Sequence, residues 1–196
     1  MSSPHDDLLL QSDRTQEQTR TVYPPNIAQG TPRSRIALVP GVPALLPSYA
    51  SIDDPVADLR AACAAAVAGL GPRVRVLASE TGLRVARSLL ADAGADEVTD
   101  DATGVLVVGN GSAKRTSRAP GDLDERAEVF DDHLRRALVE PLPAALTALD
   151  EQLADEMWAD VAGIRALAGV LTASHRPEVS YDAAPFGVQY WVICWV

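Results

Sequence analysis

The residue types best suited to binding chemistry in this chain gather in one short segment. It reads Gly109-Asn110-Gly111-Ser112-Ala113-Lys114-Arg115-Thr116-Ser117-Arg118. Its glycines allow a ligand to approach the backbone closely, its hydroxyls offer hydrogen bonds, and its basic side chains could neutralise a phosphate or carboxylate. The whole chain is acidic, with a formal net charge of -10. The local reversal of charge therefore predicts a site for a small anionic ligand, formed by Gly109, Asn110, Gly111, Ser112, Lys114 and Arg115.

This segment does not match the two common phosphate-binding loops of nucleotide-binding proteins. A Walker A loop needs glycine directly before the lysine, but Ala113 precedes Lys114. In the dinucleotide fingerprint G-x-G-x-x-G, the third glycine position is Lys114. A simpler alternative is that the glycines form a turn and the basic side chains pair with acids such as Asp122 or Asp124, which contributes little free energy.

The elements that position this segment are predicted from hydrophobic periodicity and capping signals. The first half of the domain alternates between strands at residues 35–39 and 74–78 and helices at residues 55–70 and 81–93. Asp54 is the expected N-cap of the first helix, with Pro55 as its first residue, and Gly94 is expected to end the second. An apolar strand at residues 105–108 then leads into the Gly109 segment.

The second half is predicted to be mainly helical, with a final strand. We expect a helix that starts near Leu123 with Asp122 as cap, helices at residues 144–149 and 151–173, the latter bent near Gly163, and strands at residues 179–181 and 188–196. The last strand is apolar on both faces, so it belongs inside the sheet or in a dimer interface. Alternation of strands and helices predicts a three-layer α/β/α domain with a mixed, mostly parallel sheet.

Ligands of such folds bind beyond the carboxyl ends of the strands. This places residues 40–47, residues 109–118 and, if the last hairpin reaches that end, residues 182–187 at the predicted site. In the third loop Asp182 could accept a hydrogen bond from a ligand, although an aspartate before a Pro-Gly turn often caps its own backbone.

Composition predicts one folded domain at residues 35–196, preceded by a flexible polar tail at residues 1–34. The alternative for the tail is a docking motif at Asp6-Asp7-Leu8-Leu9-Leu10. The acidic charge argues against a nucleic-acid partner and against an anionic membrane surface. Without an apolar run long enough to span a bilayer, the expected location is the cytoplasm. Cys63 and Cys194 are expected to be free thiols.

Three segments together resemble the class III extradiol ring-cleaving dioxygenases of the LigB type, in particular the short actinobacterial proteins of that family. They are Ile36-Ala37-Leu38-Val39-Pro40-Gly41-Val42-Pro43-Ala44-Leu45-Leu46-Pro47, Val107-Val108-Gly109-Asn110-Gly111-Ser112-Ala113-Lys114-Arg115-Thr116 and Tyr181-Asp182-Ala183-Ala184-Pro185-Phe186-Gly187-Val188. The likeness extends with gaps from Ile36 to Val196. It implies the α/β fold and a pocket shared by Gly41, the Gly109 segment and Asp182.

The resemblance also implies a ferrous iron held by two histidines and one glutamate, with open positions for a catechol and dioxygen. One histidine is expected in a Pro-His-Pro-Pro motif, but this chain has Pro40-Gly41-Val42-Pro43. Residues 71–101, where the second is expected, contain none, and Ala113 follows Ser112 where a catalytic histidine is expected. His5, His133 and His175 lack partners at ligand spacing. We therefore expect neither a metal nor another cofactor.

These observations predict a catalytically degenerate relative of the dioxygenases that binds a small anionic ligand or a protein partner. Two alternatives stay open. The chain could be an enzyme with a different, metal-independent reaction that uses Ser112, Lys114 and Asp182. It could instead be a homodimeric structural or interaction protein that associates through the strand at residues 188–196.

Overall fold

The computed structural model describes residues 35–49 and 54–196. The chain divides into two units, Met1–Pro32 and Arg33–Val196, and all that follows concerns the second. The tail predicted at residues 1–34, with its possible docking motif, lies outside the described residues.

A six-stranded mixed sheet forms the centre of the described unit, in the order β3-β2-β4-β1-β6-β5. Its strands are β1 (Arg35–Val39), β2 (Arg73–Leu77), β3 (Asp96–Glu97), β4 (Gly104–Val108), β5 (Pro177–Ala183) and β6 (Tyr190–Trp195). The first four strands are parallel to one another, and β6 pairs antiparallel with both β1 and β5. The predicted mixed, mostly parallel sheet is confirmed.

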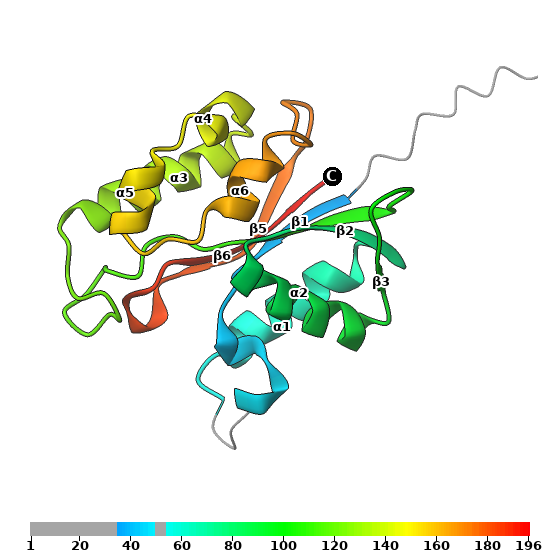
Figure 1. Ribbon diagram of the computed structural model, residues 1–196, viewed down its shortest axis with the longest axis horizontal. Helices are drawn as coiled ribbons and strands as arrows, with labels where there is room; N and C mark the ends of the chain where they lie inside the picture. Colours follow the sequence, from blue (N-terminus) through cyan, green and yellow to red (C-terminus); the bar gives the residue numbers. More distant parts are fainter. Residues whose placement is uncertain (1–34, 50–53) are drawn as a thin grey trace, which may run out of the picture. The chain divides into compact units, whose positions relative to one another are not determined.

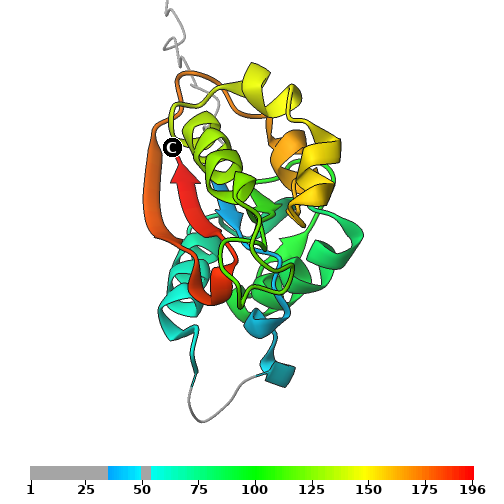
Figure 2. The ribbon, with the colours of Figure 1, turned by 90° about the vertical axis from the view of Figure 1, so that its left-hand side faces the viewer.

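Helices cover both faces of this sheet (Figures 1 and 2). Helices α1 (Ala57–Ala68) and α2 (Glu80–Ala93) lie on one face. The other face carries α3 (Arg126–Val139), α4 (Pro143–Thr147), α5 (Glu151–Glu156) and α6 (Ala162–Leu167). In the described part of the chain, no helix has the length and apolar character needed to cross a membrane.

Two hydrophobic cores result, one on each face, and the strands contribute alternate residues to them. Tyr190 and Val192 of β6 join the core under α1 and α2, whereas Trp191, Ile193 and Trp195 join the core under α3 to α6. Because β6 lies between β1 and β5, the sheet itself buries both of its apolar faces. The burial predicted for this strand therefore needs no dimer, and a homodimer stays a prediction.

Two helices begin later than the sequence predicted. Helix α1 starts at Ala57, because Asp54 forms a preceding turn in which its Oδ1 accepts a hydrogen bond from Val56 N (3.1 Å). Helix α3 starts at Arg126 and not near Leu123, because Asp124 forms a preceding turn in which its Oδ1 accepts a hydrogen bond from Arg126 N (3.0 Å), while the expected cap Asp122 has a left-handed backbone (φ 61°). By contrast, α2 ends as predicted at Gly94, which has φ 67°.

The single bent helix predicted at residues 151–173 is wrong. Helices α5 and α6 are separate, and a non-helical connector at residues 157–161 joins them. The break falls at Trp158, whose φ of 56° is incompatible with a continuing helix. Gly163 has another role, since a Cβ there would lie 2.3 Å from the Val108 carbonyl oxygen. It lets α6 pack directly on the sheet backbone.

Candidate ligand-binding site

The loops that follow β1 and β4 meet at the carboxyl edge of the sheet, since these strands are parallel and Val39 is paired with Val108. The chain leaves β1 toward α1 and leaves β4 toward α3, so the two connections run to opposite faces (Figure 1). In open α/β sheets, ligands bind in the gap between two such strands. We call this gap, between Pro40 and Gly109, the switch-point crevice.

The connector at residues 157–161 closes part of the switch-point crevice. Asn110 N donates a hydrogen bond to the Asp160 carbonyl oxygen (3.0 Å). A Cβ on Gly109 would lie only 2.6 Å from that same oxygen, so Gly109 is needed for this close backbone approach. These two predicted site residues therefore hold the protein's own chain, not a ligand.

Gly41 lies on the other side of the crevice. A Cβ at this position would be 3.1 Å from Val108 Cγ1 and 3.4 Å from Asp160 Oδ2. Asp160 Oδ2 also accepts a hydrogen bond from Ser79 Oγ (2.7 Å), and Ser79 caps α2. A larger side chain at position 41, such as the histidine of the dioxygenase motif, would require Val108 to move.

A depression lies farther along the same edge, between α3 and the hairpin that joins β5 to β6. Its volume of about 360 Å³ is within the range of small-molecule sites. We call it the polar cleft. It is lined by Arg115, Asp131, Asp132, Arg135, Asp182, Ala183, Ala184, Gln189 and Trp191.

A buried carboxylate anchors the polar cleft to the Gly109 segment. Asp131 is 1% exposed, and its two oxygens accept hydrogen bonds from Ser112 N and Ser112 Oγ, both at 2.7 Å. Arg115 Nη1 lies 3.4 Å from Asp131 Oδ2. Burial raises the pKa of Asp131, and the hydrogen bonds from Ser112 and the charge of Arg115 offset only part of this rise. Gly111 makes the arrangement possible, because a Cβ there would lie 2.4 Å from Asp131 Oδ1.

A chain of hydrogen bonds continues from this carboxylate to the mouth of the cleft. Arg115 Nη1 donates to Gln189 Oε1 (2.9 Å), and Gln189 Nε2 donates to Asp182 Oδ1 (2.9 Å). Asp182 Oδ2 accepts from Arg135 Nε (2.5 Å). These side chains come from three separate elements, and their mutual contacts fix them in place before any ligand arrives.

Two kinds of donor in the polar cleft have no acceptor among the residues the structure describes. Trp191 is 1% exposed, yet its indole Nε1 makes no hydrogen bond there. In Arg135 only Nε is engaged, so its two terminal nitrogens are also without described acceptors. A buried donor that lacks a partner, such as Trp191 Nε1, carries a free-energy penalty that a bound acceptor would remove, whereas the half-exposed Arg135 side chain is open to solvent.

The predicted site residues thus divide between two places. Arg115 and Asp182 line the polar cleft, and Ser112 and Gly111 support it through Asp131. Gly41, Gly109 and Asn110 belong to the switch-point crevice instead.

Lys114 is not among the residues that line the polar cleft. Its Nζ lies 5.8 Å from the ring centroid of Trp158, an exposed side chain of the connector. A cation and an aromatic face at this distance attract each other. The alternative of paired basic residues is correct in part, because Arg115 also contacts Glu128 (3.2 Å).

The residues present do not fit the iron site that the dioxygenase resemblance implies. Within residues 35–49 and 54–196 no three His, Cys, Asp or Glu side chains are grouped so that they could hold a metal ion. His133 lies on α3, and His175 Nδ1 accepts a hydrogen bond from Thr172 N (3.0 Å). Both cysteines are free thiols, and burial raises the pKa of Cys63 to about 12, which disfavours the thiolate that binds metals.

Sequence reasoning missed Asp131, Arg135, Gln189 and Trp191 as site residues. Of these four residues, only Asp131 could have been recognised from the sequence pattern. Asp131 stands four residues after Ala127 and three before Leu134, so it occupies a position on the apolar stripe of its helix. A charged residue at a core position needs a partner, which could have pointed to the basic segment.

No family model matches the chain, and no curated protein matches it either.

Proposed function

We propose that this protein binds a small anionic ligand in the polar cleft and does not perform ring cleavage. The proposal rests on two neighbouring residues of the cleft lining: Trp191, whose buried Nε1 has no acceptor among the described residues, and the half-exposed Arg135, whose terminal nitrogens are free of described partners. A carboxylate or phosphate accepts hydrogen bonds from both kinds of donor, and the guanidinium fork suits its geometry.

The charges of the cleft restrict the size of the anion. Arg115 and Arg135 line the cleft together with Asp131, Asp132 and Asp182, so acids outnumber bases and the proposed anion is a small one held directly by Arg135. Asp131 is buried and already engaged by Ser112 and Arg115, so the ligand need not contact its carboxylate. The ligand that fits best has one anionic group for Arg135 and a polar atom for Trp191.

Ser112 favours binding over nucleophilic chemistry. It is fully buried, and its hydroxyl donates to Asp131, so its oxygen is not accessible to a ligand in the cleft. A serine nucleophile needs an accessible oxygen with a base that removes its proton. The enzyme alternative with Ser112, Lys114 and Asp182 has the further difficulty that Lys114 packs on Trp158.

The ancestry of the fold belongs to the same proposal. The three segments that resemble LigB-type dioxygenases supply the crevice loop, the cleft loop and the hairpin. In this view, the chain is a cytoplasmic relative that kept the sheet, replaced the first-loop histidine with Gly41, and binds its ligand beside the old crevice.

Isothermal titration calorimetry with succinate and with inorganic phosphate tests the proposal, and succinamide serves as the uncharged control. We expect one binding site per chain for at least one of the anions and none for succinamide. Arg135→Gln should weaken that binding about tenfold, because it removes a charged hydrogen-bond donor of the cleft.

The neighbouring arginine provides a matched control. Arg136 lies on the same helix and is exposed, with Glu140 as its ion-pair partner, but it does not line the cleft. Arg136→Gln should leave the affinity unchanged. An equal loss of affinity in the two variants would mean that only the overall charge of the protein matters. If neither anion binds, the proposal is wrong.

A further inference from the structure

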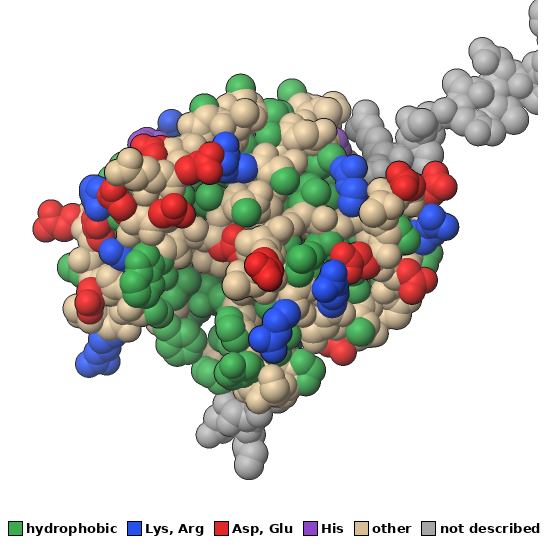
Figure 3. Space-filling model, viewed as in Figure 1, with side chains coloured by type: hydrophobic (Ala, Val, Ile, Leu, Met, Phe, Trp, Pro, Cys, Tyr) green, Lys and Arg blue, Asp and Glu red, His purple; other side chains and the backbone are tan. Residues whose placement is uncertain are grey.

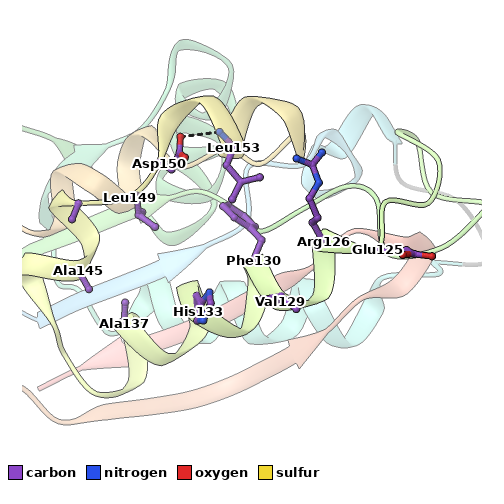
Figure 4. A pocket seen from close by; sticks show the side chains of 11 residues that line it. Glu125, Arg126, Val129, Phe130, His133, Ala137, Ala145, Leu149, Asp150 and Leu153 are labelled. Atoms are coloured by element: carbon purple, nitrogen blue, oxygen red, sulfur yellow. Dashed lines mark hydrogen bonds between the residues drawn. The ribbon is translucent and has the colours of Figure 1, made fainter.

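A second depression lies on the other side of α3 and has a different character. It runs between α3 and the pair α4 and α5, with a volume of about 560 Å³ (Figure 4). We call it the apolar groove. Its lining residues are Glu125, Arg126, Val129, Phe130, His133, Ala137, Ala145, Ala148, Leu149, Asp150 and Leu153.

The apolar groove follows one face of α3. Val129, Phe130, His133 and Ala137 occur at helical spacing, and Figure 4 shows Phe130 directed toward Leu153 between the two helical walls. The 14 residues of α3 span about 21 Å, or about four helical turns. The groove is therefore elongated, as a groove that accepts another helix must be.

Its apolar surface is open to solvent. Val129 is 57% exposed, and Ala145 and Ala148 are also exposed, although all three lie on the walls of the groove. A contiguous exposed apolar surface beside a polar rim marks an interaction site in soluble proteins. Small alanine side chains leave room for larger apolar side chains of a partner.

The helices around the groove carry a strong excess of negative charge. Between Glu125 and Glu156 the chain has nine Asp and Glu residues but only three arginines, and two of these acids, Asp131 and Asp132, belong to the polar cleft. Glu125 and Asp150 line the groove itself, and Glu125 has no ion-pair partner within the part of the chain that the structure describes. Arg126, the one arginine of the lining, is paired with Asp124 and Glu156. This charge is complementary to a basic partner and repels an acidic one.

We infer that the apolar groove binds a basic amphipathic helix of a partner protein. Apolar side chains of that helix, at positions i, i+3 or i+4, and i+7, would enter between α3 and α5, and its flanking Lys or Arg residues would face the acidic rim. This inference is independent of the ligand proposed for the polar cleft, because the two depressions share no lining residue.

Fluorescence anisotropy with a labelled synthetic peptide tests the inference in the full chain. The probe has about five helical turns, with leucine at the helical spacing and lysine elsewhere. A second peptide has the same composition with the leucine positions scrambled, and a third has glutamate in place of lysine. We expect the first to bind at least about tenfold more tightly than either control, with affinity that falls as salt is added.

Two exposed valines give matched variants. Val129→Asn should weaken binding of the first peptide about tenfold, because it places a polar side chain in the groove. Val179→Asn, on β5 and 39% exposed, should leave binding unchanged, since Val179 is not part of the groove. Equal affinity for the ordered and scrambled peptides, or no effect of Val129→Asn, would overturn the inference. So would saturable groove binding of a small hydrophobic dye that the ordered peptide fails to displace.

Discussion

The switch-point crevice and the polar cleft lie on the same edge of the sheet but differ in what fills them. In the crevice, the connector at residues 157–161 contacts Asn110 and Gly109, and Asp160 Oδ2 accepts a hydrogen bond from the Ser79 hydroxyl. In the cleft, Trp191 Nε1 has no acceptor among the described residues. Figure 3 shows hydrophobic side chains around a hollow at the lower edge of the molecule. In the same view, Figure 1 shows the loop that follows β1 at this edge.

This difference shows that fold topology predicts the edge of the sheet at which a site forms more reliably than the position along it. The rule for open α/β sheets indicates the gap between β1 and β4. In this protein, polar groups of the chain itself form hydrogen bonds across that gap. The donor without a described acceptor, Trp191 Nε1, belongs to the neighbouring region where α3 and the β5–β6 hairpin meet.

The largest expected effect tests how closely α6, which follows the connector, packs on the sheet backbone beside the crevice. Gly163→Ala should lower the free energy of unfolding by about 3 kcal/mol, because the new Cβ would meet the Val108 and Leu77 carbonyl oxygens at 2.3 and 2.4 Å. Urea denaturation measures it. Gly169→Ala is the control, since its nearest neighbour is Ala166 O at 3.5 Å, and it should change stability by less than about 0.5 kcal/mol. Equal stability of the two variants would mean that α6 does not pack directly on the sheet backbone at Leu77 and Val108.

A pair of tryptophans tests whether the cleft holds an unused donor. Trp195 Nε1 donates to Leu138 O (3.2 Å), whereas Trp191 Nε1 has no described acceptor. Both substitutions by Phe remove similar buried volume, so Trp195→Phe should destabilise the protein by about 1 kcal/mol more than Trp191→Phe. Only Trp191→Phe should weaken anion binding. The reverse order of stabilities, measured by urea denaturation, would contradict the assignment.

The pH dependence of stability tests the buried carboxylate that anchors the cleft. The pKa of Asp131 is raised in the folded protein, so its contribution to stability is fully present below the unfolded pKa and is lost as pH rises through the folded pKa. The free energy of unfolding of the wild type, relative to Asp131→Asn, should therefore increase as the solution is acidified from neutral pH. A difference that decreases on acidification would show that the folded-state pKa is lowered.

The smallest expected effect concerns Lys114. Because this side chain packs on Trp158, Lys114→Ala should leave anion affinity unchanged and cost only about 0.5 kcal/mol of stability through the lost cation–π contact. Titration calorimetry and urea denaturation measure the two quantities. A tenfold loss of affinity would place Lys114 in the ligand site and would weaken the distinction between the two regions.

Much of the fold could be predicted from the sequence, because strands and long helices have local hydrophobic patterns. The two-faced strand β6 and the C-terminal Gly94 of α2 are examples. Helix ends were harder to predict, since Asp122 and Trp158 adopt left-handed conformations that depend on tertiary contacts.

The candidate site was only partly predictable. Ser112, Arg115 and Asp182 stood out as polar residues in predicted loops, and they meet at the polar cleft. Their connection through Asp131 and Gln189 joins elements that are distant in sequence, and spacing alone does not reveal such contacts. Lys114 belongs to the same basic segment, but its side chain packs on Trp158 and does not line the cleft.

Indole N–H resonances of the three tryptophans, followed by NMR during titration with succinate or phosphate, test the central claim most directly. Trp191 lies in the cleft, Trp158 on the connector that closes the crevice, and Trp195 in the core. The bound anion should selectively shift the Trp191 indole resonance. A shift of the Trp158 resonance with Trp191 unchanged would place the ligand at the crevice and would show that the polar cleft is not the binding site.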